Sequence, residues 1–238
     1  MDVTIIIPAL NEAGNIARLV AEIPRDVADH IKVIAVDNGS TDNTAEVAWQ
    51  AGAQVISEPR RGYGQACAAG VAAIPTSNML PSDLVAVFLD GDGSFDPAEL
   101  PHLLAPITDQ KADLVMGSRA LGGIEPGAMP AHQRFGNTLV SRLMGLLYSL
   151  QITDLGPYRA IRWDTLSQID MREMTFGWPT EMIVKAARMN AKIVEIPVSY
   201  RRRWSGQSKV SGTVRGTLMA TYYILGVTLR YSVFKKGA

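Results

Sequence analysis

Short apolar runs rich in β-branched residues recur through the first half of the chain, and helix signals separate them. The runs predict strands at Val3–Ile7, Ile31–Val36, Gln54–Ser57, Leu84–Leu89 and Leu114–Gly117. Helices are expected from Asn11 to about Ile23, after a cap at Ser40 or Thr41, over Ala66–Ala73 and from about Pro97. Strands and helices that alternate over short connections form a mainly parallel, twisted sheet with helices on both faces. We therefore expect an α/β fold.

Polar clusters follow three of the predicted strands. They are Pro8 to Glu12, Asp37 to Thr41 and Asp90 to Asp92. In an open parallel sheet, ligands bind beyond the carboxyl ends of the strands, at the point where the strand order reverses. Each cluster alone is also typical of ordinary turns and helix caps. Their coincidence at successive strand ends predicts one shared crevice.

Asp90 and Asp92 follow the most apolar of these strands and are separated by Gly91. Alternate side chains of a strand point the same way, so the two carboxylates can converge on one cation. Hard oxygen ligands suit Mg²⁺ or Mn²⁺, which usually share their coordination shell with substrate phosphates. A solvated Asp-Gly turn is the alternative. A calcium loop fits worse, because Phe95 and Pro101 stand where its glycine and closing glutamate are required.

Composition excludes several classes of function. The chain has 23 acidic and 23 basic residues, which gives no general case for binding nucleic acid. One cysteine, Cys67, excludes an internal disulfide or a cysteine-based zinc cluster, and we expect it to be buried. No run approaches the roughly 20 apolar residues of a membrane-spanning helix. We expect a cytoplasmic protein, either free or peripheral on the inner face of the cell membrane.

Gly62 and Gly64 form a glycine-rich turn that opens a predicted helix. It is not a dinucleotide fingerprint, because Cys67 stands where the third glycine belongs and the turn does not follow the first strand. Two interpretations stay open. The segment is a tight turn, or it lets backbone approach a ligand at a helix N-terminus, where free N–H groups favour anions.

Several of these segments together resemble a known family. Ile6-Ile7-Pro8-Ala9-Leu10-Asn11-Glu12, Val36-Asp37-Asn38-Gly39-Ser40-Thr41-Asp42-Asn43-Thr44, Asp90-Gly91-Asp92 and Gly117-Ser118-Arg119 resemble the inverting family 2 glycosyltransferases of the GT-A, Rossmann-like fold. Three later segments are similar to the dolichyl-phosphate mannose synthase branch, namely Thr153 to Ala160, Gly177 to Glu181 and Ser205 to Gly212.

The resemblance implies a metal-dependent transfer of a hexose from a UDP- or GDP-sugar to a polyprenyl phosphate. It implies one domain over 1–238, with a donor half at 1–118, an acceptor half at 119–215 and a C-terminal amphipathic helix at 216–238. The nucleotide-sugar would be held by Pro8, Ala9, Asn11, Glu12, Asp37, Gly64, Gln65, Asp90, Gly91 and Asp92, with the metal on Asp90 and Asp92. Ser94 stands where the mannose synthases carry a glutamine ligand, which leaves the choice between Mg²⁺ and Mn²⁺ open.

The acceptor decides which further groups are needed. A phosphate monoester is mostly dianionic at neutral pH and needs cations, whereas a hydroxyl needs a general base. The expected cations are Arg119, Arg134 and one or more of Arg201, Arg202, Arg203 and Lys209. Asp154 and Glu181 are the base candidates for a hydroxyl acceptor. Otherwise Asp154 orients an arginine, and Glu181 caps or pairs.

Two helical segments carry apolar stripes. The first runs from about Arg134 to Gln151, and the second has Leu218, Tyr222, Leu225 and Leu229 at helical spacing with basic residues near its end. Such helices lie in membrane interfaces, but the same stripes are typical of core or of a homo-oligomer surface. Gly122 to Pro130 is rich in glycine and proline, and we interpret it as a mobile active-site loop.

Three alternatives to the leading hypothesis stay open. The first is the same donor chemistry with a soluble or polysaccharide acceptor. The second is a nucleotidyltransferase, which shares the α/β architecture and the metal carboxylates. The third is a subunit that binds a nucleotide-sugar without turnover.

Overall fold

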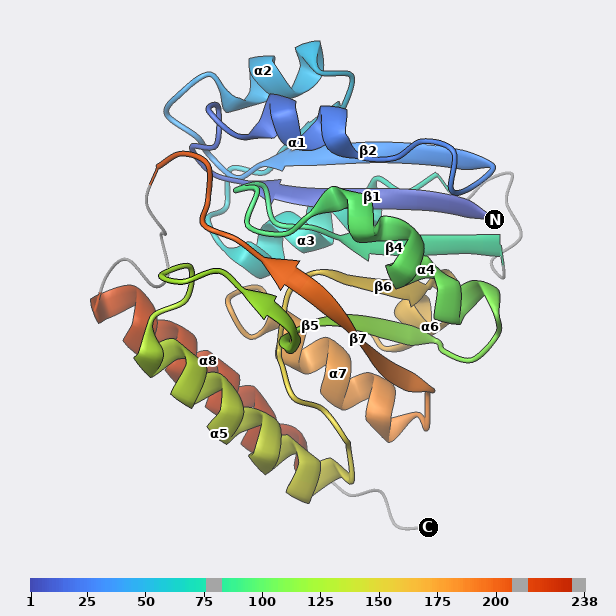
Figure 1. The fold of residues 1–238 in the computed structure, drawn as a ribbon, viewed down its shortest axis with the longest axis vertical. Helices are drawn as coiled ribbons and strands as arrows, with labels where there is room; N and C mark the ends of the chain where they lie inside the picture. The colour runs from blue at the N-terminus through green and yellow to red at the C-terminus, as the bar shows by residue number, and fades with distance from the viewer. Residues whose placement is uncertain (76–82, 207–213, 233–238) are drawn as a thin grey trace.

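A computed structural model describes residues 1–75, 83–206 and 214–232. Its strands are β1 (Asp2–Ala9), β2 (His30–Asp37), β3 (Gln54–Ser57), β4 (Leu84–Phe88), β5 (Leu114–Ile124), β6 (Arg159–Arg162) and β7 (Ile193–Tyr200). They form one sheet in the order β3-β2-β1-β4-β6-β5-β7 (Figure 1). β6 runs antiparallel to both of its neighbours, and the other pairs are parallel. The predicted mainly parallel α/β sheet is confirmed.

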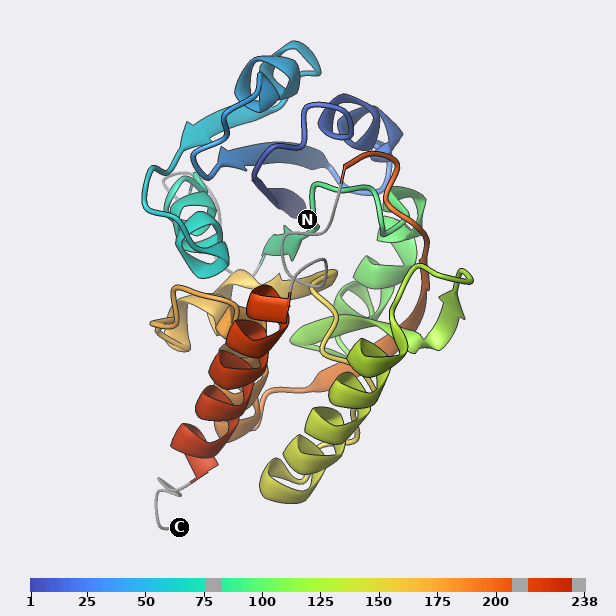
Figure 2. The ribbon, with the colours of Figure 1, turned by 90° about the vertical axis from the view of Figure 1, so that its left-hand side faces the viewer.

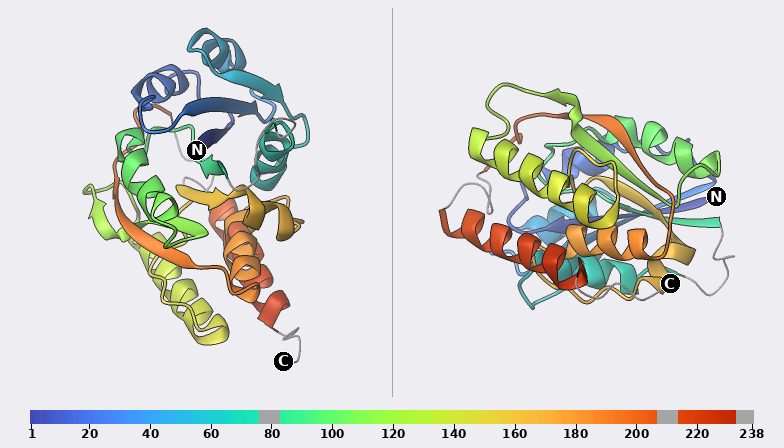
Figure 3. Two further views of the ribbon diagram at one scale, coloured as in Figure 1. Left: turned by 90° about the vertical axis from the view of Figure 1, so that its right-hand side faces the viewer. Right: turned by 90° about the horizontal axis from the view of Figure 1, so that it is seen from below.

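Eight helices accompany this sheet in the described part of the chain. They are α1 (Ile16–Glu22), α2 (Thr44–Gln50), α3 (Tyr63–Ala72), α4 (Leu100–Thr108), α5 (Ala131–Tyr148), α6 (Trp163–Gln168), α7 (Trp178–Arg188) and α8 (Val214–Ser232). α1 and α4 cover one face of the sheet, and α3 and α7 cover the other (Figures 2 and 3). Helices on both faces are therefore confirmed.

Side-chain alternation along the central strands produces these two layers. In β4, Val85 and Val87 pack into the core under α1 and α4, whereas Ala86 and Phe88 pack into the core under α3 and α7. All of these side chains are buried. A strand buried on both faces is continuously apolar, and that is the pattern from which β1 and β4 were predicted. Cys67 is buried in the second core, as expected.

Two predicted boundaries near β1 and β2 are wrong. α1 begins at Ile16 rather than Asn11, because Asn11 has a left-handed φ of 53° that ends the regular conformation there. α2 begins at Thr44, and Asp42 accepts the Thr44 backbone N–H at 3.0 Å. The predicted cap at Ser40 or Thr41 is replaced because those residues bond to Asn11 instead.

The segment interpreted as a loop at Gly122 to Pro130 is partly strand. β5 continues to Ile124 and pairs there with Tyr200 of β7, after a register shift between Ser118 and Gly123. The proposed division between residues 118 and 119 therefore falls inside β5, and the one between 215 and 216 falls inside α8. The two halves stay a prediction.

α5 and α8 lie side by side below the sheet, as the views agree (Figures 1 and 2). The Tyr148 hydroxyl at the end of α5 donates to the Thr228 carbonyl of α8 at 2.6 Å. Among the described residues, none of the helices has the length and apolar character required to cross a membrane.

Candidate active site

A cavity of about 710 Å³ lies at the carboxyl ends of the central strands. Pro8 and Ala9 of β1, Asn38 after β2 and Asp90 to Asp92 after β4 contribute to its wall. Residues of all three polar clusters therefore line one crevice, as predicted from their positions after strands. Arg119 of β5, Tyr200 of β7, Arg203 beyond it and Tyr223 of α8 line the same cavity.

Asp90 is a buried carboxylate in an unfavourable electrostatic setting. Burial raises its pKa well above the ordinary range, and the charge of neighbouring Asp92 raises it further. The Tyr63 hydroxyl donates a hydrogen bond to Asp90 Oδ1 at 3.1 Å. Asp92 is more open, with 21% of its side chain exposed. The pair therefore concentrates negative charge at the end of β4 that a cation would relieve.

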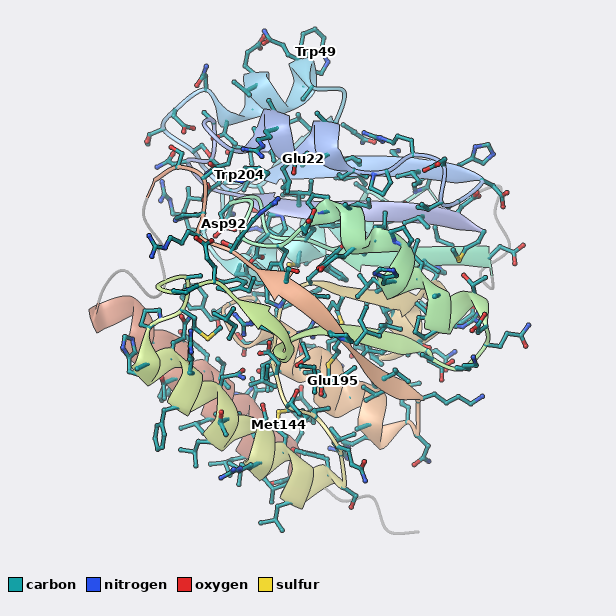
Figure 4. The ribbon with its side chains drawn as sticks, viewed as in Figure 1. Glu22, Trp49, Asp92, Met144, Glu195 and Trp204 are labelled. Carbon is teal, nitrogen blue, oxygen red and sulfur yellow. The ribbon has the colours of Figure 1, made fainter. Side chains whose placement is uncertain are left out.

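Arg203 supplies positive charge to this end of the cavity (Figure 4 labels Asp92 and Trp204 there). Its Nη2 atom lies 2.9 Å from Glu12 Oε1 and 3.2 Å from Asp92 Oδ2. Its Nε and Nη1 atoms are buried, and neither has a hydrogen-bond partner among the described residues. The guanidinium thus bridges two carboxylates and keeps two donor atoms for another acceptor.

The neighbouring arginines point elsewhere. Arg202 is 63% exposed and donates to the Pro126 carbonyl, which holds the turn after β5. Arg201 donates to the Gly93 carbonyl at 2.9 Å and lies over the Trp204 ring at 4.7 Å. The structure therefore places Arg203, and not Arg202, in the cavity.

Arg119 and Asp154 form a buried ion pair beside the cavity. Asp154 accepts three hydrogen bonds of 2.7 Å from Arg119, namely from the backbone N–H, Nε and Nη2. The two side chains are 11% and 1% exposed. Burial opposes ionisation of Asp154, but the bonds from Arg119 outweigh it and hold the pKa below its ordinary value. Asp154 thus orients an arginine, the second of the two roles expected for it.

The glycine-rich turn approaches protein backbone at Gly64, while Gly62 lines the cavity. The Gly64 N–H donates to the Thr175 carbonyl at 3.2 Å, and the Gln65 N–H donates to the Met174 carbonyl at 3.0 Å. A Cβ on Gly64 would lie 2.4 Å from the Glu173 carbonyl oxygen. The close approach that glycine permits here joins two segments of the chain.

Two of the predicted nucleoside ligands, Asn11 and Asp37, accept hydrogen bonds from the backbone of the loop after β2. Asn11 Oδ1 accepts the Thr41 N–H at 2.7 Å, and Asp37 Oδ1 accepts the Ser40 N–H at 3.0 Å. Glu12, Pro8 and Ala9 do line the cavity. The contact of any of these residues with a nucleoside stays a prediction.

Three remaining candidates lie outside the cavity or outside the described residues. Arg134 is exposed on α5, next to cavity-lining Gln133. Glu181 accepts the backbone N–H groups of Arg172 and Glu173 and the Tyr231 hydroxyl, so it ties α7 to its neighbours. Lys209 falls in 207–213, outside the described residues.

Residues that were not singled out from the sequence also line the cavity. Asn38 donates to the Glu58 and Arg60 carbonyls at 2.9 and 2.8 Å and accepts the Gly62 N–H at 2.8 Å. It therefore joins the loops after β2 and β3. Its position within the Asp37 to Thr41 cluster was the available signal. Tyr63 carried none, because its partner Asp90 is 27 positions away.

Asp90 and Asp92 form a donor set for a hard divalent cation. Within the described part of the chain there is no cluster of three or more His, Cys, Asp or Glu side chains that could enclose a metal ion. Mg²⁺ is usually held by one or two carboxylates together with water and substrate phosphates. Two crowded carboxylates that open onto a cavity fit that mode of binding.

Comparison with known proteins identifies the family of the chain. The model of the family described as glycosyl transferase family 2 matches residues 4–174. An uncharacterised glycosyltransferase of Mycobacterium tuberculosis is 39% identical over 219 residues, 92% of this chain and 94% of its own. An undecaprenyl-phosphate mannosyltransferase of Micrococcus luteus is 30% identical over 241 residues, 97% and 96% of the two chains.

A solved structure has the same fold. It is glucosyl-3-phosphoglycerate synthase from Mycobacterium tuberculosis in complex with Mn²⁺, UDP and glucosyl-3-phosphoglycerate. The TM-score is 0.71 with 19% identity, over 99% of this chain and 81% of that one. The likeness confirms the fold class predicted from the sequence. With the family match over most of the chain, it follows that this protein belongs to glycosyl transferase family 2 and is a glycosyltransferase.

Proposed function

We propose that this glycosyltransferase moves a hexose from a UDP- or GDP-sugar to a polyprenyl phosphate, with Mg²⁺ or Mn²⁺ held by Asp90 and Asp92. The observation that carries the proposal is the charge arrangement of one cavity. Two acidic side chains at the end of β4 share the cavity with Arg119 and Arg203, and Asp92 is paired with Arg203. Such a cavity suits a ligand that brings both a divalent cation and phosphate groups.

The donor half of the reaction requires stabilisation of a departing nucleoside diphosphate. A divalent ion supplies this by neutralising charge on the leaving oxygen. Asp90 and Asp92 would hold that ion. Arg203, which lines the cavity beside Asp92, would add positive charge near the phosphate oxygens.

The hydrogen bonds of the two base candidates support a phosphate acceptor rather than a hydroxyl. Asp154 is engaged by Arg119, and Glu181 is engaged by backbone amides and Tyr231. A phosphate monoester needs no base, because it is mostly dianionic at neutral pH. One of its oxygens would attack the anomeric carbon as the bond to the diphosphate breaks. Arg119 would hold the acceptor phosphate, and the sugar would transfer with inversion.

The similar proteins offer both kinds of acceptor. The Micrococcus luteus relative is named an undecaprenyl-phosphate mannosyltransferase, which supports a lipid acceptor here. The structural neighbour is a synthase of glucosyl-3-phosphoglycerate, a soluble product, but the likeness at 19% identity bears on the fold alone. A soluble acceptor, which the sequence left open, stays the second candidate.

α5 and α8 provide a surface for the prenyl chain. Phe135, Leu139 and Leu146 of α5 are 71%, 53% and 82% exposed at spacings of one helical face. On α8, Tyr222 and Leu229 are 70% and 52% exposed, and Met219 and Tyr223 line the cavity itself. An apolar surface that begins at the cavity would place a lipid tail beside its phosphate. We propose peripheral membrane association through these helices.

The test offers the enzyme radiolabelled UDP- and GDP-hexoses with Mn²⁺ and either undecaprenyl phosphate or 3-phosphoglycerate. We expect label in the organic phase only when the lipid is present, with release of nucleoside diphosphate. Label only in a soluble product would contradict the lipid acceptor. Release of pyrophosphate would indicate a nucleotidyltransferase. Donor binding without turnover on either acceptor would indicate a binding subunit.

A further inference from the structure

Glu195 of β7 is an acidic residue outside the cavity whose carboxylate is fully engaged. Figure 4 labels it on β7, apart from Asp92 at the strand ends. It lines a second cavity of about 510 Å³ together with Arg142, Gln151 and Thr153. Burial raises the pKa of Glu195 above its ordinary value, although hydrogen bonds to the carboxylate partly compensate. Burial of a carboxylate is unfavourable, so its hydrogen bonds must compensate for the lost contact with water.

The Glu195 carboxylate receives its bonds from two consecutive residues. Oε1 accepts the Asp154 backbone N–H at 2.9 Å, and Oε2 accepts the Thr153 backbone N–H at 2.8 Å. Oε2 also accepts the Thr153 hydroxyl at 2.9 Å. Thr153 Oγ1 lies 2.7 Å from Ser118 Oγ, one residue before Arg119. The carboxylate thus fixes the backbone of residues 153 and 154 relative to β5 and β7.

The next link runs from this backbone to the cavity. Asp154 directs its carboxylate at Arg119 and accepts three bonds from it. The Arg119 guanidinium also lies 5.1 Å from the centre of the Tyr200 ring, and both residues line the cavity. A rotation of the residue 154 backbone would move the carboxylate that defines the position of this guanidinium.

We infer that Glu195 is a positioning residue for sugar transfer, which acts through Asp154 to hold Arg119 toward the substrate phosphates. The inference rests on the proposed function, in which Arg119 contacts phosphate. It adds a residue that touches neither the cavity nor any ligand in it. Removal of the hydrogen-bond partners that orient metal ligands typically costs about 10–100-fold in affinity or activity, and we expect a loss of the same order for a partner that orients Arg119.

The test compares Glu195→Gln and Glu195→Ala with Glu99→Gln as a matched control. Glu99 also accepts a backbone N–H and a hydroxyl, from Ser199 on the same strand, but it has no bond to the 153–154 segment among the described residues. Glutamine keeps the length of Glu195 and replaces one acceptor oxygen by a donor. It therefore loses one of the two backbone bonds while the packing is retained.

The first measurement is the NMR signal of the Arg119 Nε–H, assigned by its loss in Arg119→Lys. We expect Glu195→Gln to shift or broaden this signal and Glu99→Gln to leave it unchanged. The second measurement is the rate of sugar transfer together with the affinity for the nucleoside diphosphate, each compared with the wild-type value. We expect Glu195→Gln to lower kcat about 10–100-fold and to keep the dissociation constant for the nucleoside diphosphate within about twofold, with Glu195→Ala more impaired.

Each result decides the inference. An unchanged Arg119 signal in Glu195→Gln overturns it, as does a wild-type kcat or an equal loss in Glu99→Gln. If Glu195→Ala does not fold, Glu195→Gln still gives both readouts. If the wild-type enzyme transfers no sugar to the lipid, the proposed function fails, while the NMR signal still shows whether Glu195 positions Arg119.

Discussion

Arg203 Nη2 donates to Asp92 Oδ2 at 3.2 Å and so joins residues 111 positions apart in the chain. Asp92 is also one of the two residues that would hold the divalent cation, so the guanidinium lies against a proposed metal ligand. Because two cations compete for one carboxylate, Arg203 should weaken metal binding when no nucleotide is present.

Arg203→Gln is therefore expected to bind Mn²⁺ about tenfold more tightly in the absence of nucleotide, equivalent to roughly 1.4 kcal/mol. Transfer should nevertheless be slower, because a charge that faces the diphosphate is lost. Calorimetric Mn²⁺ titration measures the first effect. Arg60→Gln, whose ion pair with Glu58 lies outside the cavity, serves as the control. Equal or weaker Mn²⁺ affinity in Arg203→Gln contradicts the competition.

Asp92→Ala is expected to abolish metal-dependent donor binding while the fold survives. Its carboxylate accepts the Ser94 N–H at 2.9 Å within the loop after β4 and one bond from Arg203 beyond β7, and Arg203 keeps its bond to Glu12. The free energy of unfolding should fall by only about 1 kcal/mol. Titration with UDP and GDP, with and without Mn²⁺, measures the loss. Asp109→Ala, at an exposed pair with Lys111, should behave as wild type. Unchanged activity in Asp92→Ala would refute the metal assignment.

Asp154→Asn is expected to destabilise the fold by about 3–5 kcal/mol at pH 7, because it leaves the Arg119 guanidinium buried without its counter-charge. Arg119 holds the pKa of Asp154 below its ordinary value of 3.8, after burial has opposed ionisation. The stabilisation is therefore complete above that value and is lost as the pH falls through the lower pKa of the folded state.

Urea unfolding across this pH range should show the difference between wild type and Asp154→Asn shrinking in acid. Asp170→Asn, at an exposed pair with Arg172, should differ little from wild type at any pH. A difference that grows on acidification would show that Asp154 is not stabilised by Arg119.

Gly64→Ala tests the close approach between α3 and the segment before α7. Its Cβ would lie 2.4 Å from the Glu173 carbonyl oxygen, so backbone must move, at a cost of about 1–3 kcal/mol. Gly136→Ala in α5 has no atom within 4 Å of its Cβ and should stabilise the helix by about 0.5–1 kcal/mol. Thermal unfolding distinguishes them. Equal stability of the two variants would disprove the steric argument.

Phe135→Glu and Leu146→Glu test the apolar surface of α5. Each removes a side chain that is more than two thirds exposed, and loss of its burial in lipid is worth about 1.5–3 kcal/mol. Vesicle sedimentation should show at least tenfold weaker binding, with donor affinity unchanged. Trp49→Glu removes an aromatic side chain that is 65% exposed on α2, at the far end of the molecule (Figure 4), and should bind vesicles as wild type does. Unaltered vesicle binding by the α5 variants would contradict the proposed docking surface.

Local sequence was enough to predict the centre of the sheet. β1, β2 and β4 are short apolar runs, and β3 was predicted with the bounds that it has. These strands are buried on both faces, so their composition alone distinguishes them from the surrounding turns. β6 and β7 were not predicted. β6 begins with Arg159, a buried cation whose pKa burial lowers to about 10 and which bonds the Pro179 and Gly156 carbonyls.

The carboxylates and Arg119 were also named from the sequence, because each directly follows or ends a predictable strand. The choice among Arg201, Arg202 and Arg203 could not be made in this way. Consecutive side chains leave the chain in different directions, and only the path after β7 sends one of them to Glu12 and Asp92. All three are arginines in one run, so the surrounding sequence does not distinguish them.

The sequence by itself determined the fold class, the polar turns that follow β1, β2 and β4, and the two aspartates after β4. Hydrophobic periodicity depends only on residues that are close in the sequence, so it can be recognised without knowing which segments pack together. Only the tertiary structure decided that Glu195 accepts the Asp154 N–H, that Arg119 is the arginine paired with Asp154, and that Gly64 lies against the Met174 backbone. Those contacts join residues 35 to 110 positions apart, and the free energy that selects them arises only when the chain has packed.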